Sequence, residues 1–167
     1  MRPMRHADRQ VADEAGIRAI LDRCQVCRLA LWDEEGPYIV PMSYGYRWDE
    51  GGLKLYFHCA AEGRKLDAIR RDPRAAFEMD ADYEVIGAES ACGYTCAFRS
   101  ITGAGILRVV ESSQEACEAL TCLMRRQTGR DFTFTPDMLP GVCVLCLDVQ
   151  SVCGKCNGPA LRRAADR

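Results

Sequence analysis

The chain has 167 residues, of which 48% are hydrophobic and 28% charged, and these values are ordinary for one globular domain. Its net charge of −2 gives no general electrostatic reason to expect nucleic acid or an anionic membrane as a partner. The polar start lacks the apolar core of a signal peptide, and no apolar run approaches the roughly 20 residues that span a bilayer. We therefore expect a cytoplasmic protein with a single domain over residues 1–167 and flexible tails at 1–12 and 157–167.

Three segments have the periodicity and the boundary residues of helices. Asp13 is a favourable N-cap residue, and Ser112 or Ser113 can serve the third helix in the same way. Asp72-Pro73 ends the second helix, because a residue before proline avoids the helical conformation. The predicted helices cover residues 13–23, 60–71 and 112–127.

Six segments have the alternating or continuously apolar character of strands, and turn residues separate several of them. They are residues 26–32, 37–48, 53–59, 74–80, 97–110 and 142–149. The glycines within 97–110 would permit strong bending or a close approach of the backbone. Residues 83–96 have no predicted structure. Strands paired as a local meander and broken by helices predict a mainly β fold, a six-stranded antiparallel barrel with peripheral helices.

The segment 55–80 carries the clearest chemical feature of the chain. A strand ends at His58-Cys59, a turn with glycine follows, and Arg64 and Lys65 lie where a helix begins. A helix N-terminus offers unpaired N–H groups and a partial positive charge, and both cations can bind phosphate oxygens. Two adjacent cations on a helix more often form a solvated surface, so this pattern alone leaves both interpretations open.

The order of several sequence blocks resembles that of a known family. The blocks are LAL, GPYIVPMSYGY, LYFH, GRKLDAIRRDPRAAFEMD, RSITGAG and LMRRQTGRDFTFT, and they extend over residues 5–156. This order resembles the Nim-type nitroimidazole-resistance flavoproteins within the pyridoxamine 5′-phosphate oxidase-like family. The resemblance implies an FMN-binding split barrel that works as a homodimer, with the flavin at the subunit interface.

The resemblance also implies which residues would bind FMN. One group would line the isoalloxazine ring and ribityl chain through main-chain groups, a second would hold the phosphate, and a third would reach the flavin across the dimer. In that order the groups are Pro41, Met42, Ser43 and Tyr44; Phe57, His58, Gly63, Arg64 and Lys65; and Arg99, Ser100 and Ile101. Lys65 is the first candidate for the phosphate. His58 is the candidate catalytic residue on the substrate side, and a purely structural histidine is the alternative.

Eleven cysteines are many for a chain expected in a reducing compartment. Three CxxC pairs occur, namely Cys24/Cys27, Cys143/Cys146 and Cys153/Cys156. The middle pair lies in a predicted strand, where positions three apart face opposite sides, so we interpret both as small core residues. The outer pairs could supply four zinc ligands if they met in space, and otherwise they remain thiols. We predict no metal site, and Cys59 beside His58 leaves a redox specialisation open.

The leading prediction for function is an FMN-dependent oxidoreductase that passes reducing equivalents to a small organic acceptor. The Nim resemblance suggests a nitroaromatic acceptor, and the wider family suggests a pyridoxamine-phosphate-like substrate. One alternative is a low-turnover flavin-binding redox sensor or carrier that uses its cysteines. Another is a metal-stabilised interaction protein in which Arg64 and Lys65 are only surface charges.

Overall fold

The computed structural model describes residues 4–158 and divides the chain into two compact units. The first unit contains the chain up to Cys24, Glu78–Thr102 and the chain from Val152 on. The second unit contains Gln25–Phe77 and Gly103–Ser151. The predicted tail at 157–167 lies mostly outside the described residues, whereas residues 10 and 11 of the other predicted tail form a strand.

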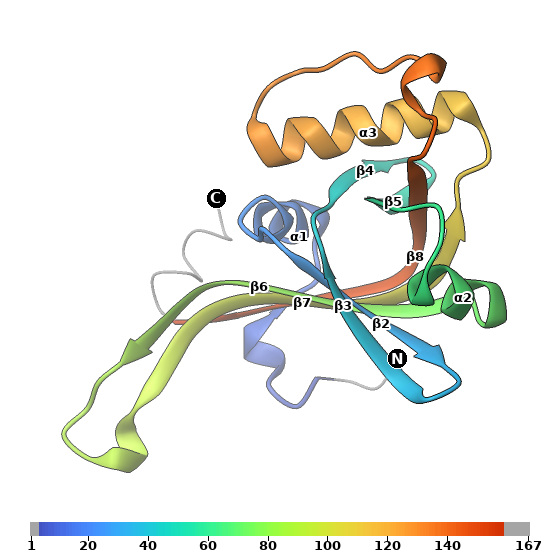
Figure 1. Ribbon diagram of the computed structural model, residues 1–167. Coiled ribbons are helices and arrows are strands. Elements are labelled where there is room, and N and C mark those ends of the chain that lie inside the picture. Colours follow the sequence, from blue (N-terminus) through green and yellow to red (C-terminus); the bar gives the residue numbers. More distant parts are fainter. Residues whose placement is uncertain (1–3, 159–167) are drawn as a thin grey trace. The chain divides into compact units, whose positions relative to one another are not determined.

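The described residues form one sheet of eight strands, shown in Figure 1. They are β1 (Gln10–Val11), β2 (Cys27–Asp33), β3 (Gly36–Met42), β4 (Gly45–Asp49), β5 (Gly52–Cys59), β6 (Arg74–Ile86), β7 (Thr95–Val109) and β8 (Cys143–Asn157). The strand order is β3-β2-β6-β7-β8-β5-β4, and β1 pairs with β8. The pairs β1–β8, β2–β3, β4–β5 and β5–β8 are antiparallel. The predicted mainly β antiparallel class is confirmed, with eight strands instead of six.

Residues 4–158 also form three α-helices, α1 (Glu14–Leu21), α2 (Arg64–Arg71) and α3 (Ser113–Thr128). The predicted N-caps of α1 and α3 are confirmed, because Asp13 accepts the N–H of Gly16 at 2.8 Å and Ser112 accepts that of Glu115 at 3.3 Å. Short 3₁₀ turns lie at Ala7–Arg9, Ala91–Gly93 and Pro136–Met138. Among the helices of residues 4–158, none is long and apolar enough to cross a membrane.

Of the two added strands, one is β1, and the other arises in the segment predicted as one strand over 37–48. This segment divides into β3 and β4, and Ser43 and Tyr44 lie between them. The Tyr44 side chain is fully buried, and its carbonyl accepts a hydrogen bond from Gln127 Nε2 at 2.9 Å. A side chain of α3 therefore takes an acceptor that could otherwise have joined a strand ladder.

The long strands extend beyond their predicted bounds. β6 continues to Ile86 and β7 begins at Thr95, so much of 83–96 is strand. β8 continues to Asn157, and Cys153–Cys156 therefore lies in a strand and not in the turn that a thiolate knuckle needs. Within the first unit, a Cβ at Gly154 would lie only 2.8 Å from Ile17 Cδ1, so glycine permits α1 to pack closely on β8.

In the second unit, α3 packs against β4 and β5. A buried apolar cluster joins them, made of Tyr56, Val110, Ala116, Ala119, Leu120, Val144 and Cys146. At Gly45 an added Cβ would lie 2.4 Å from the backbone nitrogen of Leu123. Only glycine fits this close contact between strand and helix backbones, so Gly45 sets the distance of α3 from β4.

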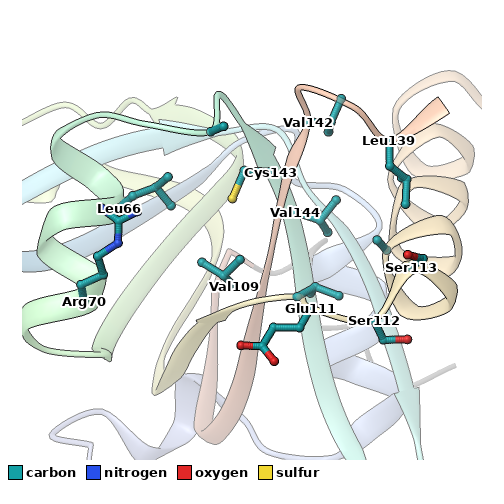
Figure 2. Close-up of a pocket in the computed structure, with 13 residues that line it drawn as sticks. Leu66, Arg70, Val109, Glu111, Ser112, Ser113, Leu139, Val142, Cys143 and Val144 are labelled. Atoms are coloured by element: carbon teal, nitrogen blue, oxygen red, sulfur yellow. The ribbon is translucent and has the colours of Figure 1, made fainter. Parts of the chain in front are cut away.

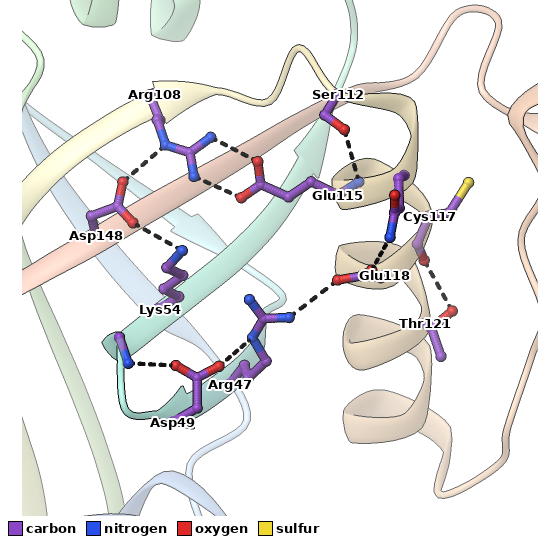
Figure 3. Close-up of polar contacts among 12 residues, drawn as sticks. Arg47, Asp49, Lys54, Arg108, Ser112, Glu115, Cys117, Glu118, Thr121 and Asp148 are labelled. Carbon is purple, nitrogen blue, oxygen red and sulfur yellow. Dashed lines mark hydrogen bonds and ion pairs between the residues drawn. The ribbon is translucent and has the colours of Figure 1, made fainter.

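A polar network also connects α3 to the strands of the second unit (Figure 3). Arg108 on β7 donates to Glu115 at 2.6 Å and to Asp148 on β8 at 2.9 Å. Arg47 on β4 donates to Glu118 at 3.1 Å. The Arg108 guanidinium lowers the pKa of Glu115 through this hydrogen bond. Each of the two contacts with α3 joins a charged side chain of a strand to a charged side chain of the helix. Together they fix the rotation of α3 about its own axis.

Candidate functional site: the cationic turn before α2

The predicted phosphate end lies where β5 leads into α2. Phe57 is fully buried opposite Leu145, whereas the next residue, His58, is exposed. Gly63 is the N-cap of α2 with φ +123°, a conformation that favours glycine. This cap explains why α2 begins at Arg64, four residues later than predicted. A Cβ at Gly63 would meet no heavy atom of the described residues within 4 Å, so the backbone there is open to a ligand.

Arg64 is held by acidic and aromatic neighbours from the β2–β3 turn. Its Nε donates to Asp33, its Nη2 lies 3.2 Å from Glu35, and its guanidinium stacks 4.5 Å from the Tyr38 ring centre. The hydrogen bond from Arg64 lowers the pKa of Asp33. Arg64 is therefore already engaged by carboxylates, and it must leave them to bind a phosphate in a fork.

Lys65 differs from its neighbour in both exposure and partners. Its side chain is half-buried in the first turn of α2. No carboxylate of residues 4–158 lies within 4.0 Å of its ammonium group. The charge acts instead on the Cys59 thiol, whose pKa it lowers against the larger effect of burial. The first N–H groups of a helix also lack partners within the helix, so Lys65 and this backbone together can bind an anion.

The segment predicted to line the flavin ring lies near the same end of β5. Gly45 pairs with Tyr56, so the residue before Gly45 lies beside the Phe57 end of β5. Pro41 and Ser43 are exposed and Met42 is half-buried. Tyr44 is buried beneath Arg126, whose guanidinium lies 5.5 Å from the Tyr44 ring centre. Exposed main-chain groups thus remain at 41–43, whereas the Tyr44 carbonyl is taken.

The third predicted group, Arg99, Ser100 and Ile101, belongs to the first unit. There Arg99 is largely buried and its Nε lies 3.2 Å from Asp82 Oδ2. Asp82 also accepts from Arg23 Nη2 at 2.6 Å, and this hydrogen bond is the largest cause of its lowered pKa. Ile101 is fully buried. Arg99 therefore has a structural partner within its own unit.

Sequence reasoning missed the acidic partners of Arg64. Asp33, Glu34 and Glu35 lie between the strands predicted at 26–32 and 37–48, and they line a cavity of about 710 Å³ with residues of α2. The cavity is lined by Asp33, Glu34, Glu35, Arg64, Asp67, Ala68 and Arg71. One signal for this contact was present in the sequence: three adjacent acidic residues in one turn and two adjacent basic residues at the start of a helix have opposite charges. Nothing in the sequence placed these two segments side by side.

The four candidate zinc ligands do not assemble in either unit. Cys27 belongs to the second unit, and Cys24, Cys153 and Cys156 belong to the first. Cys153 and Cys156 lie three apart in β8, where they face opposite sides. Across residues 4–158 no group of three or more histidine, cysteine, aspartate or glutamate side chains could hold a metal ion.

With this geometry in view, the comparison with protein families is decisive. The model of the family described as pyridoxamine 5′-phosphate oxidase matches residues 13–155, most of the chain. The chain belongs to the pyridoxamine 5′-phosphate oxidase family. The expected family is thereby confirmed, and the match covers both units. A comparison with curated proteins found no match.

Several solved structures share the fold of this family member. A proposed 5-nitroimidazole antibiotic resistance protein of Bacteroides thetaiotaomicron is 26% identical with a TM-score of 0.76, over 88% of this chain and 86% of that one. A flavocytochrome of Azotobacter vinelandii is 19% identical with a TM-score of 0.75, over 93% and 72%. An FAD and heme binding protein of Mycobacterium smegmatis is 21% identical with a TM-score of 0.74, over 93% and 80%. The last two show the fold alone.

The cationic turn has the donors that an anion such as phosphate needs. Its donors are a half-buried ammonium group and the open backbone at a helix N-terminus. A dianionic phosphate gains both from the charge and from the N–H groups. The arrangement can therefore bind a phosphorylated small molecule at the end of β5.

Proposed function

We propose that this chain is a flavoprotein that binds FMN, with the flavin phosphate on the turn before α2. The observation that carries the proposal is Lys65, a half-buried cation with no carboxylate partner in the described part of the chain. A half-buried cation has lost part of its hydration, and a bound phosphate would supply an opposite charge to it. Membership in a family named for an oxidase of a phosphorylated amine supports the same location.

Two groups of residues in the second unit would bind different parts of FMN. Lys65 and the N–H groups at Gly63–Lys65 would hold the phosphate, and the main chain at 41–43 would face the ring system. Bound FMN supplies the redox chemistry, because it can accept and release reducing equivalents. We propose a homodimer in which Arg99, Ser100 and Ile101 of a second copy complete each site. Analytical ultracentrifugation with and without FMN tests whether the protein is a dimer.

We further propose that the flavoprotein reduces a small organic acceptor, with a nitroaromatic as the first acceptor to test. The Bacteroides protein with the printed nitroimidazole-resistance description supports this choice. His58 is exposed next to the turn and can donate a hydrogen bond to such an acceptor. A purely structural role for His58 predicts no change in the reduction rate when Gln replaces it.

The binding experiment titrates FMN into flavin-free protein and follows the quenching of flavin fluorescence. We expect Lys65→Ala to weaken FMN binding by roughly tenfold to a hundredfold, since it removes a charge-assisted hydrogen bond. Arg70→Ala is the matched control, because Arg70 lies in the same helix, is exposed and pairs with Asp67. Equal weakening by both variants, or no FMN binding by the wild type, contradicts the proposal. Riboflavin, which lacks the phosphate, should show no difference between wild type and Lys65→Ala.

The turnover experiment starts from anaerobic protein whose FMN has been reduced with dithionite. Addition of a nitroaromatic should reoxidise the flavin faster than it reoxidises free reduced FMN, and His58→Gln, saturated with FMN, should slow this step. A rate no higher than that of free FMN favours the alternative, a redox sensor or carrier. The specific observation that favours this alternative is a pair of neighbouring thiols, Cys59 and Cys143, beside the same turn.

A further inference from the structure

Cys59 and Cys143 lie directly opposite each other at the end of the β5–β8 ladder, where the register pairs their Cα atoms. Neither is in a disulfide, both side chains are partly exposed, and the Cys143 thiol is near enough to raise the pKa of the Cys59 thiol. Opposite residues of an antiparallel pair have Cα atoms about 4.5–5.5 Å apart, within the range of about 4.4–6.8 Å that a disulfide spans. A bond between the two sulfur atoms therefore needs little movement of the backbone.

This pairing differs from the one that the CxxC pattern suggested. Cys143 and Cys146 were interpreted together as core residues, and Cys146 is indeed fully buried, with its thiol 3.7 Å from Asp148. Cys143 is partly exposed and faces the other side of β8. Its thiol neighbour is therefore the cross-strand Cys59 and not the cysteine three positions along the chain.

A cavity of about 260 Å³ gives access from solvent to Cys143 of this pair (Figure 2). Cys143 is one of the lining residues, and Figure 2 shows its sulfur atom among them. The walls near it are largely apolar, with Val109, Val142, Val144 and Leu139, and the charged groups are Arg70 and Glu111. This volume accommodates a small organic molecule, so a low-molecular-weight reagent can reach the Cys143 thiol.

The electrostatics of the pair determine how fast it reacts. Burial and the neighbouring Cys143 raise the pKa of the Cys59 thiol to about 11, and Lys65 acts in the opposite direction. The reactive form of a cysteine is the thiolate, so Cys59 is mostly unreactive at neutral pH. Disulfide exchange at Cys59 is therefore slow at neutral pH and becomes faster as the pH is raised.

We propose that Cys59 and Cys143 are a redox-active dithiol that closes to a cross-strand disulfide by exchange with a small organic disulfide in this cavity. One thiolate attacks a sulfur of the small disulfide, and the S–S bond breaks to release one small thiol and leave a mixed disulfide. The second thiolate then attacks the protein sulfur and releases the other small thiol. Two protein thiols are oxidised, one small disulfide is reduced, and the two protons leave with the small thiols. The inference does not depend on a bound flavin.

The disulfide would tie the end of β5 to the start of β8. Residues 60–63 lead directly from Cys59 to the cationic turn, so the cross-link would restrain the backbone that presents Lys65. The reduced pair leaves this end of the ladder joined only by non-covalent contacts. At this site the redox state of small thiols would therefore determine whether β5 and β8 are joined by a covalent bond.

The test uses the reduced full-length protein and 2-hydroxyethyl disulfide as the probe. The exchange is stopped with acid and the small reagents are removed. The remaining thiols are then alkylated in denaturant near neutral pH, and tryptic peptides are identified by mass spectrometry. Cleavage after Lys54 and Arg64 isolates Cys59 in peptide 55–64, while Cys143 falls in peptide 131–155 with Cys146 and Cys153. We expect these two peptides to be joined, with fragment ions that place the bond at Cys143, and to form faster at about pH 9 than at about pH 7.

Single variants separate closure from simple labelling. Cys59→Ser should trap Cys143 as a lasting mixed disulfide with the probe, and Cys143→Ser should abolish the cross-link, whereas wild type should resolve its mixed disulfide at least tenfold faster. Cys92→Ser, at an exposed cysteine of the first unit, is the control and should leave the cross-link unchanged. The proposal fails if wild-type Cys59 and Cys143 are recovered alkylated, remain as mixed disulfides, or pair with other cysteines. The wild-type result decides the matter even if a variant folds poorly.

Discussion

Arg64 donates its Nε–H to Asp33, and the other carboxylate oxygen of Asp33 accepts the N–H of Glu35 at 2.8 Å. One carboxylate thus closes the β2–β3 turn and holds the first residue of α2. The adjacent Lys65 has no such restraint among the described residues. The two neighbouring cations therefore have different tasks: Arg64 positions the helix start, and Lys65 remains available to a ligand.

Asp33→Asn should release Arg64 from its main carboxylate partner and make the guanidinium available to the proposed phosphate. We expect severalfold tighter FMN binding together with a lower midpoint of thermal unfolding, because a contact that holds α2 is lost. Fluorescence titration and thermal unfolding measure the two effects. Glu34→Gln is the control in the same turn, since Glu34 lies 3.9 Å from Arg71 and makes no ion pair with Arg64 within 4.0 Å. Weaker FMN binding by Asp33→Asn would show that its negative charge supports the site.

Glu115→Gln should lower the free energy of unfolding by about 1 kcal/mol near neutral pH, because the ion pair with Arg108 is partly exposed to solvent. The hydrogen bond from Arg108 lowers the pKa of Glu115 in the folded protein. Its contribution is therefore complete above the ordinary value of about 4.3 and is lost as the pH falls through the lower folded value.

Urea unfolding of wild type and Glu115→Gln across the acid range tests the predicted pH dependence of the free energy of unfolding. The difference between the two proteins should shrink as the pH falls below about 4. Glu111→Gln, which removes the same charge from an exposed position before α3, should have little effect at neutral pH. A difference that grows toward acid pH would reverse the inferred sign.

Gly105→Ala should destabilise the fold by about 3 kcal/mol or more, since the new methyl group would overlap the backbone of β8. A Cβ at this position would lie 2.1 Å from the carbonyl oxygen of Asp148, and neither backbone can move without breaking the ladder. Gly87→Ala is the control, because a Cβ there would meet only the Tyr94 ring at 3.7 Å. Denaturant unfolding of both variants compares them, and equal stability would mean that β7 and β8 are less closely packed than the structure shows.

Asp13→Ala should cost about 1 kcal/mol of stability by removing the side-chain cap of α1. Asp13→Asn retains an acceptor at the same place and should recover most of the loss. Urea unfolding at neutral pH distinguishes them. If alanine and asparagine are equally destabilising, the negative charge and not the hydrogen bond to Gly16 accounts for the effect.

The features that the sequence predicted well depend on neighbours along the chain. Asp13 and Ser112 cap the helices that follow them, and Asp72-Pro73 ends α2, because each effect acts within one helical turn. The close approach expected of the glycines in 97–110 is confirmed at Gly105. The mainly β class also followed from alternation and turn residues.

The features that were missed depend on segments far apart in sequence. Asp33 meets Arg64 only because β2 and α2 fold together, and Cys59 meets Cys143 only through the register of β5 and β8. At the outer end of β6 the apolar residues Tyr83 and Val85 are exposed, so this segment is a strand through pairing and not through burial of one face. The roles of the individual flavin-site residues stay predictions, since they need a bound cofactor to be tested.

The first unit is made of segments that leave the ribosome at different times, so it cannot fold until the last of them has been made. It draws on the start of the chain, on Glu78–Thr102 and on the chain from Val152 on. β1 pairs with β8 through Gln10 and Lys155, so β1 cannot form its pairing until β8 has left the ribosome. The second unit has all of its segments once Ser151 has emerged. A nascent chain therefore exposes the apolar face of α1 until β8 has been made, and chaperone binding is expected at this helix.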